Sequence, residues 1–522
     1  MNLYIHRPNQ HLERGERALM RIATELTSFL LTVQRSLTFE TLHLSKPQRE
    51  TVAHLLVEFA EDVYQDIGIW RSLEQYNRDF FGTPLPCLLP ADAPVDAQPV
   101  TPARVQYFLW TLYSELDPEL TLAPQHRDLT RLASEIAAFL HERFSHVRFD
   151  SGVKTFLTQP NTYGWDVKKK LIWLGQHSYL FRLSFGNYVR AHGGKPDIPT
   201  IDDFLCQETT AWSGLGVIDL LAALLDITDE QRATLRGWYE RHTAYFRVVT
   251  AREPVLELVN LLNERSYSVR VEGEVKHFQE GGLVFGALVP WDGLWYWSGV
   301  QQTFGVVPDE TLQSVLREFP RKASQIVYRY CESQAAKARE IVGKHYRQFL
   351  AYYGKDFVHY SDNRSMAEDL RKFYRYQQEA TLKDLSAADR QKYARANLLQ
   401  PLVLPPELLN MKNGVGLYFH PAEGQELMAG FNAIVSGLRK QGEHLTEDEA
   451  ASLKSFLHGD AISPEFVRAV VRAYGDASIA TVFLIQREAA PGYLEYLLRR
   501  YKGHFYRRRY PSLTLVNHEF ER

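Results

Sequence analysis

Apolar residues recur at three- and four-residue steps along the first 146 residues, which is the period of a helix with one buried face. The clearest run is Leu19, Ile22, Ala23, Leu26, Leu30, Val33 and Leu37. The segment Ser45-Lys-Pro-Gln48 predicts the start of a second helix, because serine and glutamine at this spacing form a capping box and proline is tolerated in the first turn. A similar helical period returns over residues 147–245. The N-terminal half is therefore predicted to be helical.

A proline-rich segment interrupts the first helical region. Residues 83–102 carry prolines at positions 84, 86, 90, 94, 99 and 102. Each proline fixes φ and removes a backbone donor, so we expect an extended strap rather than a helix.

The period changes from helix to strand between residues 246 and 306. Tyr267, Val269 and Val271 alternate with polar residues, which is typical of a half-buried strand. Pro290-Trp-Asp-Gly293 separates two apolar runs, and Asp-Gly is a hairpin signal. These features predict a small antiparallel sheet or barrel that packs on neighbouring helices, because so small a module is marginal alone.

Helical spacing resumes after residue 307 and continues into a C-terminal segment with one short strand, Val415–Phe419. The predicted fold is a mainly α multidomain chain, α+β overall. Its predicted segments are a helical domain with the proline strap (1–146), a second helical domain (147–245), the β module (246–306), basic helices (307–400) and an α/β segment with a basic aromatic tail (401–522).

Composition narrows the class of protein. The 522 residues are 45% hydrophobic and 24% charged, which excludes a disordered, collagen-like or coiled-coil chain. The three cysteines, Cys87, Cys206 and Cys331, form no CxxC pair, which excludes a zinc ribbon and fits a reducing compartment. The charged N-terminus lacks the apolar core of a secretory signal, and no apolar stretch reaches membrane-spanning length. We expect a cytoplasmic protein with no membrane contact, no metal and no cofactor.

Charge is distributed unevenly, although the net charge is only −3. Residues 40–120 hold 13 acidic and five basic residues, a balance of −8, whereas residues 317–396 hold 17 basic and ten acidic residues, a balance of +7. Residues 487–509 add a balance of +5. Opposite charge at the two ends favours contact between them, a protein partner, a second copy of the chain, or a nucleic acid at the basic end.

The strongest cationic stretch, residues 499–510, alternates with aromatic residues. Cations neutralise phosphates, and aromatic faces stack on unpaired bases, so this pattern suits RNA or single-stranded DNA. The candidate nucleic-acid-binding residues are Arg499, Arg500, Lys502, Tyr506, Arg507, Arg508, Arg509 and Tyr510. The alternative interpretation is a terminal segment whose aromatic side chains dock on the core.

Common catalytic motifs are missing from the sequence. It contains no P-loop, no dinucleotide-binding glycine fingerprint, no HExxH and no GxSxG. Whether the chain is an enzyme therefore stays open. The catalytic candidates are Asp202, Asp203 and Glu208, with His177 or Ser213. The structural alternative makes Asp203 the capping-box partner of Thr200, Cys206 a buried apolar residue and Ser213 a helix cap.

The segment Trp291-Asp-Gly-Leu-Trp-Tyr-Trp297 concentrates aromatic rings in the β module. Strand alternation places Trp295 and Trp297 on one face and Tyr296 on the other. Indoles at this density are typical of a small barrel core, and they are also suited to stacking on a base or ligand ring.

The leading hypothesis is a non-catalytic binding or assembly subunit whose basic C-terminal half contacts RNA or single-stranded DNA. A hydrolase or nuclease with an acidic site around Asp202, Asp203 and Glu208 is the alternative. A protein–protein scaffold is the second alternative.

Overall fold

The chain forms a mainly helical α+β protein in the computed structural model. The model describes residues 3–8, 10, 16–90, 98–147, 150–273, 275–322, 332–390, 406–410, 412–459, 462–488 and 490–507. Cys331 and the predicted nucleic-acid contacts Arg508, Arg509 and Tyr510 lie outside these residues. Two compact units are present, one comprising Met1–Glu318 with Phe483–His504 and the other comprising Phe319–Val482 with Phe505–Arg522.

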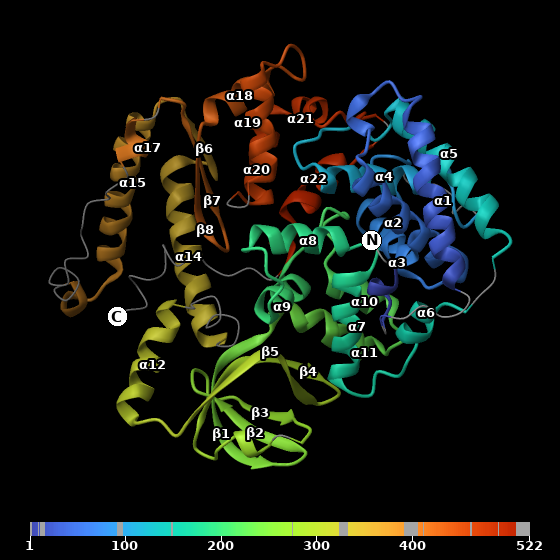
Figure 1. Cartoon of the computed structure of the whole chain (residues 1–522). Coiled ribbons are helices and arrows are strands. Elements are labelled where there is room, and N and C mark those ends of the chain that lie inside the picture. Colours follow the sequence, from blue (N-terminus) through green and yellow to red (C-terminus); the bar gives the residue numbers. More distant parts are fainter. Residues whose placement is uncertain are drawn as a thin grey trace. The chain divides into compact units, whose positions relative to one another are not determined.

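The first unit combines a helical body with a β-barrel (Figure 1). Its helices before the barrel are α1 (Arg17–Gln34), α2 (Lys46–Gln65), α3 (Ile69–Phe81), α4 (Pro102–Leu116), α5 (Arg127–Phe144), α6 (Gly152–Leu157), α7 (Gly164–His177), α8 (Arg182–Ala191), α9 (Ile198–Gln207), α10 (Val217–Leu224) and α11 (Asp229–Arg236). Short 3₁₀ turns are η1 (Leu3–His6), η3 (Glu40–Leu42), η4 (Gly237–Glu240) and η5 (Val275–His277). Helix α22 (Tyr493–Lys502) belongs to this unit as well and is followed by the turn η6 (Gly503–Tyr506).

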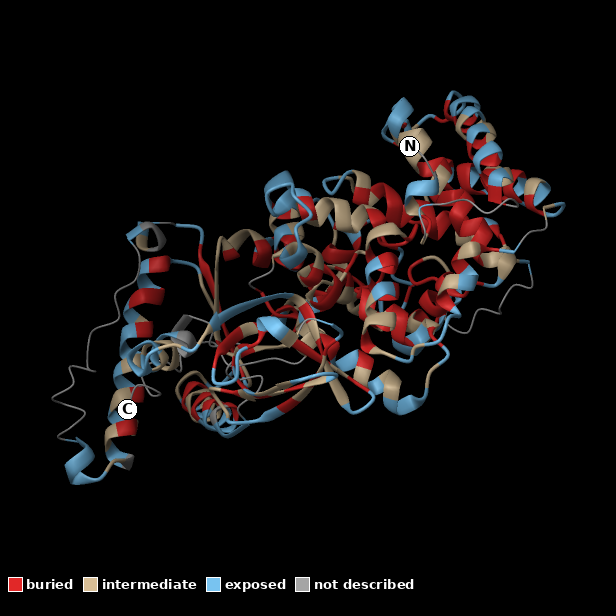
Figure 2. Ribbon diagram, turned by 60° about the horizontal axis from the view of Figure 1, so that its bottom comes forward, coloured by how far each residue is buried: buried red, intermediate tan, exposed pale blue. Residues whose placement is uncertain are grey.

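The predicted helical faces are confirmed in α1 and α2. Leu19, Leu26 and Leu30 of α1 are buried. Gln48 accepts a hydrogen bond from the backbone N–H of Ser45 at 2.9 Å, so the predicted capping box opens α2. Figure 2 shows helices of the chain with buried positions in red beside exposed positions in pale blue, as amphipathic packing requires.

The β module is a closed five-stranded barrel with strand order β1-β2-β3-β5-β4. Its strands are β1 (His242–Arg252), β2 (Val255–Asn260), β3 (Ser266–Arg270), β4 (Leu283–Trp291) and β5 (Leu294–Gly305). The sequence predicted an antiparallel module from residue 246, whereas the first strand begins at residue 242 and β3 pairs with β5 in parallel, with Val269 opposite Trp295. Alternation within single strands does not reveal such a crossover pairing.

The barrel packs on the helical body through one side. Helices α7, α9 and α11 contact strands β4 and β5. The barrel core contains Ala244, Phe246, Val248, Leu256, Leu258, Tyr267, Val269, Val271, Phe278, Val284 and Leu288. Trp295 and Trp297 pack against this core while half-buried, which leaves part of each indole beyond it.

The second unit holds a three-stranded antiparallel sheet with helices. The strands are β6 (Phe357–Tyr360), β7 (Val415–His420) and β8 (Gly424–Ala429), in the order β6-β7-β8. The helices are α14 (Glu332–Tyr353), α15 (Asn363–Asp384), α17 (Pro406–Asn410), α18 (Phe431–Arg439), α19 (Glu447–His458), α20 (Pro464–Tyr474) and α21 (Ala477–Val482), and α12 (Asp309–Lys322) leads into this unit along the chain. The predicted strand at 415–419 is confirmed, and β7 is buried along its whole length.

No helix within the described ranges is both long and apolar enough to cross a bilayer.

Candidate functional site

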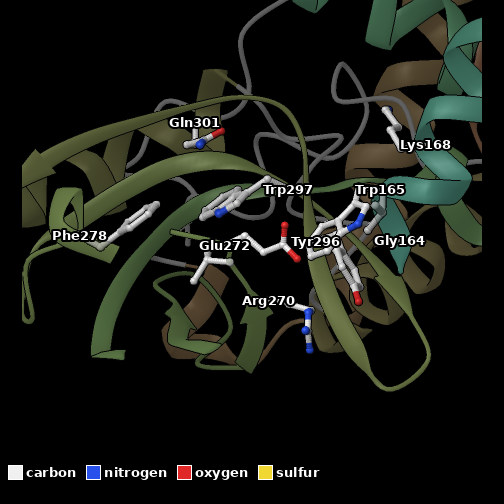
Figure 3. Close-up of a pocket in the computed structure, with 11 residues that line it drawn as sticks. Gly164, Trp165, Lys168, Arg270, Glu272, Phe278, Tyr296, Trp297 and Gln301 are labelled. Carbon is white, nitrogen blue, oxygen red and sulfur yellow. The ribbon is translucent and has the colours of Figure 1, made fainter. Parts of the chain in front are cut away.

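A pocket of about 240 Å³ lies between the start of α7 and the barrel. Helix α7 contributes Gly164, Trp165 and Lys168, and the barrel contributes the rest (Figure 3). The barrel residues in its lining are Arg270, Val271, Glu272, Phe278, Val289, Tyr296, Trp297 and Gln301. The pocket is smaller than the 300–1,000 Å³ of a typical drug-sized site, so it fits one ring system rather than an extended ligand.

Aromatic rings form two walls of this pocket. Trp165 meets Tyr296 edge to face, with ring centroids 5.3 Å apart. Phe278 and Trp297 lie nearly parallel, with an interplanar angle of 3° and centroids 6.2 Å apart. Rings of this kind offer faces and edges on which a planar ligand can stack.

The local sequence explains how α7 reaches the barrel. Asp166 accepts a hydrogen bond from the backbone N–H of Tyr163 at 2.9 Å, which fixes the first turn of α7. A Cβ at Gly164 would lie 2.6 Å from the Tyr296 ring. Only glycine therefore lets the helix start lie directly on this tyrosine and bring Trp165 beside it.

Two buried donors beside the pocket lack a hydrogen-bond partner among the described residues. They are Nε1 of Trp297 and Nε of Arg270. The Arg270 guanidinium lies over the rings of Tyr163 and Trp165, at 4.5 and 5.9 Å from their centroids. Buried polar groups are normally satisfied, so these two donors mark an incompletely paired region at the edge of the pocket.

Lys168 connects the pocket to a buried ion-pair network. Its ammonium donates to Asp202 and, at 2.9 Å, to Ser298 Oγ on β5. Ser298 Oγ donates to Asp202 at 2.9 Å. Arg241 pairs with Asp202 and with Asp203. The two cations and two carboxylates neutralise each other, so Lys168 brings little net charge to the pocket.

Asp202 is held as an ion rather than poised for proton transfer. Burial favours its protonated form, but the charges of Lys168 and Arg241 outweigh burial and keep the pKa of Asp202 below its ordinary value near 3.8. The Asp202 side chain is only 4% exposed and is occupied by donors from Lys168, Arg241, Ser298 and Cys206. A general base at neutral pH needs a pKa closer to 7 and access to substrate.

Asp203 does not cap α9, which corrects the structural alternative offered for it. The helix begins at Ile198, and Asp197 is its cap, accepting from the Thr200 N–H at 2.9 Å. The cap therefore lies three residues before the predicted one. Asp203 is half exposed and pairs with Arg241.

Two of the remaining catalytic candidates, Ser213 and His177, have their contacts away from Asp202. Ser213 is buried and its Oγ hydrogen-bonds the Tyr107 hydroxyl at 2.9 Å. His177 lies nine residues beyond Lys168 on α7, which is roughly 13 Å along the helix axis. Its ring contacts His6, with centroids 5.7 Å apart, and burial together with the charge of Arg182 lowers the pKa of His177. Glu208 follows the end of α9 and is half-buried.

The predicted nucleic-acid residues of the C-terminal stretch are placed differently from one another. Arg500 is 6% exposed, donates to the Tyr496 hydroxyl at 2.9 Å and lies over Trp110, and Lys502 is fully buried. Burial removes these two side chains from any phosphate-binding surface, which corrects the prediction for them. Arg499 is half-buried, with its guanidinium 3.8 Å from the Phe80 centroid.

The last two described members of this stretch, Tyr506 and Arg507, are half-buried and belong to the second unit. The Tyr506 hydroxyl accepts a hydrogen bond from Arg468 at 2.7 Å. The alternating pattern of residues 499–510 therefore does not form one continuous exposed stripe over its described part.

The acidic stretch 40–120 is partly internal. Its buried carboxylates are Glu58, Glu61, Asp62, Glu74 and Glu115. Arg7 pairs with Glu61, Arg182 with Glu58 and Arg104 with Glu74. Sequence charge therefore overstates the negative charge of this surface.

Sequence reasoning identified Tyr296 and Trp297 but missed Trp165, Lys168, Arg270 and Glu272. The only local signal was the β-strand pattern that ends at Val271, because Arg270 precedes this residue and Glu272 follows it. Within the described part of the chain, no group of three or more histidine, cysteine or carboxylate side chains is placed to hold a metal ion. No family model, curated protein or solved structure matches the chain.

Proposed function

We propose that the barrel of this chain binds single-stranded nucleic acid and that its aromatic pocket receives one unpaired base. The observation that carries the proposal is the gathering of Trp165, Phe278, Tyr296 and Trp297 around one pocket beside Arg270. Stacking on aromatic rings and cationic contact with the backbone are the two components of single-strand recognition. The chain acts in this proposal as a non-catalytic binding subunit.

The barrel topology supports the same proposal. A closed five-stranded barrel in which β1 pairs with β2 and β4, and β3 with β5, has the strand order of OB-type barrels. In that fold, the face of β2 and β3, with the loops that join β1 to β2 and β4 to β5, binds oligonucleotides or oligosaccharides. Topology alone does not assign a function. The pocket, which includes the end of β3, supplies the specific support.

Two arginines at opposite ends of β3 are suited to contact the phosphates. Arg265 is exposed and stacks over Tyr267 and Trp295, 5.3 Å from each centroid, and Arg270 stacks over Tyr163. With two phosphate contacts, the logarithm of the binding constant is expected to fall with the logarithm of salt concentration at a slope of about −1.4. This slope is shallow because only two phosphates are neutralised, which leaves stacking to supply most of the affinity.

The test is fluorescence anisotropy of labelled single-stranded DNA and RNA decamers, and of a duplex, with the full chain across a salt series. We expect single strands to bind more tightly than the duplex. Trp165→Ala removes a stacking face and is expected to weaken binding roughly 5- to 150-fold, whereas Trp165→Phe retains a ring and most of the affinity.

Arg270→Gln separates the cationic contribution from stacking. It is expected to reduce the salt slope by about 0.7, the contribution of one phosphate contact. Arg252→Gln is the matched control, because Arg252 is an exposed arginine on β1 and is absent from the pocket lining. The proposal is wrong if no single strand binds at low salt, or if Arg252→Gln and Arg270→Gln change the slope equally.

A further inference from the structure

Glu272 adds an acidic group to a pocket that is otherwise aromatic and cationic. It follows the end of β3 and lines the pocket. Figure 3 shows its carboxylate between the Trp297 indole and the Tyr296 ring rather than directed toward Arg270. A carboxylate is a poor neighbour for a phosphate, so its presence indicates that this part of the pocket recognises something other than the nucleic-acid backbone.

We infer that the pocket selects guanine, an inference that rests on the proposed binding of single strands. A carboxylate offers two acceptor oxygens side by side and no donor. Guanine carries two adjacent donors, N1–H and the N2 amino group, on one edge. Adenine and cytosine each place an acceptor nitrogen beside their amino group, and uracil and thymine flank their single N–H with two carbonyl oxygens. Only guanine therefore presents a matching pair to Glu272.

The size of the guanine ring also suits the aromatic walls of the pocket. Trp165, Tyr296 and Trp297 line the pocket, and a purine offers these rings a larger face than a pyrimidine does.

Charge balance in the pocket favours a neutral base. Lys168 is paired with Asp202, whereas Arg270 and Glu272, the other two charged groups of the pocket lining, have no ion pair within the part of the chain that the structure describes. One positive and one negative group together give no net attraction for an anion. Selection by edge contacts is therefore expected to exceed selection by charge.

The experiment compares decamers of thymidine that carry one central guanine, adenine, cytosine or hypoxanthine, all measured with the full chain. A bidentate contact of this kind is expected to favour guanine by roughly 5- to 150-fold over adenine and cytosine. Hypoxanthine lacks the N2 amino group and keeps N1–H and O6, so it isolates one of the two hydrogen bonds. We expect its affinity to lie between those of guanine and adenine.

Glu272→Gln tests the residue itself, since glutamine presents one donor and one acceptor in the place of two acceptors. The Glu272→Gln variant is expected to lose the preference for guanine. Its affinity for the decamers that carry adenine or cytosine should equal that of the wild type. Glu253→Gln is the matched control, because Glu253 is an exposed glutamate on the same barrel and is absent from the pocket lining. Thermal unfolding of both variants checks that the fold is intact.

The outcomes separate this inference from the function on which it rests. Equal binding of all four decamers, or a guanine preference that survives Glu272→Gln, overturns the inference and leaves single-strand binding in place. A free nucleotide is the other source of the same base, and guanosine monophosphate is the probe for it. If guanosine monophosphate binds in a Glu272-dependent way while no decamer binds, the proposed strand binding is wrong and the recognition of guanine by Glu272 applies to a free nucleotide. If neither probe binds, both are wrong.

Discussion

Asp202 gives the most direct test of how the barrel is joined to the helical body. Its carboxylate on α9 accepts hydrogen bonds from Lys168 on α7 and Ser298 on β5, and it pairs with Arg241, next to the start of β1. Asp202→Asn keeps the size of the side chain and removes its charge. Lys168 and Arg241, at 15% and 14% side-chain exposure, are then left as buried cations with less compensation.

The expected cost follows from burial and from the partners that remain. Breaking a buried ion pair by neutralising one member costs about 3–5 kcal/mol. In the variant, Ser298 still accepts from Lys168 and Asp203 still accepts from Arg241, so we expect the lower end, about 3 kcal/mol. For a unit larger than 250 residues, this lowers the midpoint of thermal unfolding by about 5 °C.

Asp203→Asn is the matched control, since it is the same substitution one residue along α9. The Asp203 side chain is 48% exposed, and Arg241 is its one ion-pair partner among the described residues. Solvent screens such a pair, so we expect a loss of at most about 1 kcal/mol. The assay is thermal and urea unfolding of the wild type and both variants, followed by near-ultraviolet circular dichroism. Equal destabilisation by the two substitutions would refute the assignment of Asp202 as the central anion of the network.

The difference in stability between the wild type and Asp202→Asn should change with pH in a direction that follows from the pKa of Asp202. Because the folded pKa of Asp202 lies below its ordinary value near 3.8, its ion pairs contribute their full stability above that value. The contribution is lost as the pH falls through the lower, folded pKa. The gap in stability between the wild type and Asp202→Asn should therefore be constant from pH 7 to about 4 and should narrow only at lower pH.

Three further substitutions test other parts of the first unit. Burial raises the pKa of Glu115 to about 7, so the folded chain binds a proton that the unfolded chain has released, and stability falls as the pH rises from about 4.5 to 7. Glu115→Gln should remove this slope from a plot of unfolding midpoint against pH, and an unchanged slope would contradict the assignment. Gly214 has φ of +74°, and a Cβ at this residue would lie 2.1 Å from the Arg499 carbonyl oxygen. Gly193 has φ of +89°, but a Cβ at this residue would have no atom within 4 Å. Gly193→Ala should lower the free energy of unfolding by about 1–2 kcal/mol, the cost of a left-handed backbone for a residue with a Cβ. Gly214→Ala should lower it distinctly more, because α22 must also shift. Equal unfolding midpoints for the two variants would contradict this expectation and show that α22 shifts at little cost.

Local patterns predicted the elements well and their pairing less well. The Ser45 capping box and the strand at 415–419 depend on neighbours within a few residues, and both are confirmed. The parallel pairing of β3 with β5 depends on a crossover between segments about 26 residues apart, which no period within a strand encodes. The start of α9 was misplaced because Thr200 and Asp203 have capping-box spacing, while Asp197 and Ile198-Pro make the stronger start.

The candidate site was predictable only in its aromatic part. Alternation along β5 placed Tyr296 on the face opposite Trp295 and Trp297, and the structure agrees: Tyr296 packs on Trp165, while the two indoles pack against the barrel core. Lys168, Asp202 and Ser298 come from three elements far apart in the sequence. Their meeting is a property of the packed unit, and a single sequence without its fold contains no spacing that reveals it.

Charge was the least reliable guide, for a physical reason that also shapes the proposed function. Counting residues treats every ionisable side chain as part of the surface, but Arg500 and Lys502 are buried, and Lys168 and Arg241 are neutralised by Asp202 and Asp203. What remains at the pocket is a stacking surface with one cation and one carboxylate. Such a site gains little from long-range attraction to a polyanion and much from contacts that depend on the shape and edge of a ring. Weak salt dependence combined with strong base preference is therefore the behaviour that distinguishes this barrel from the basic tail that the sequence first suggested.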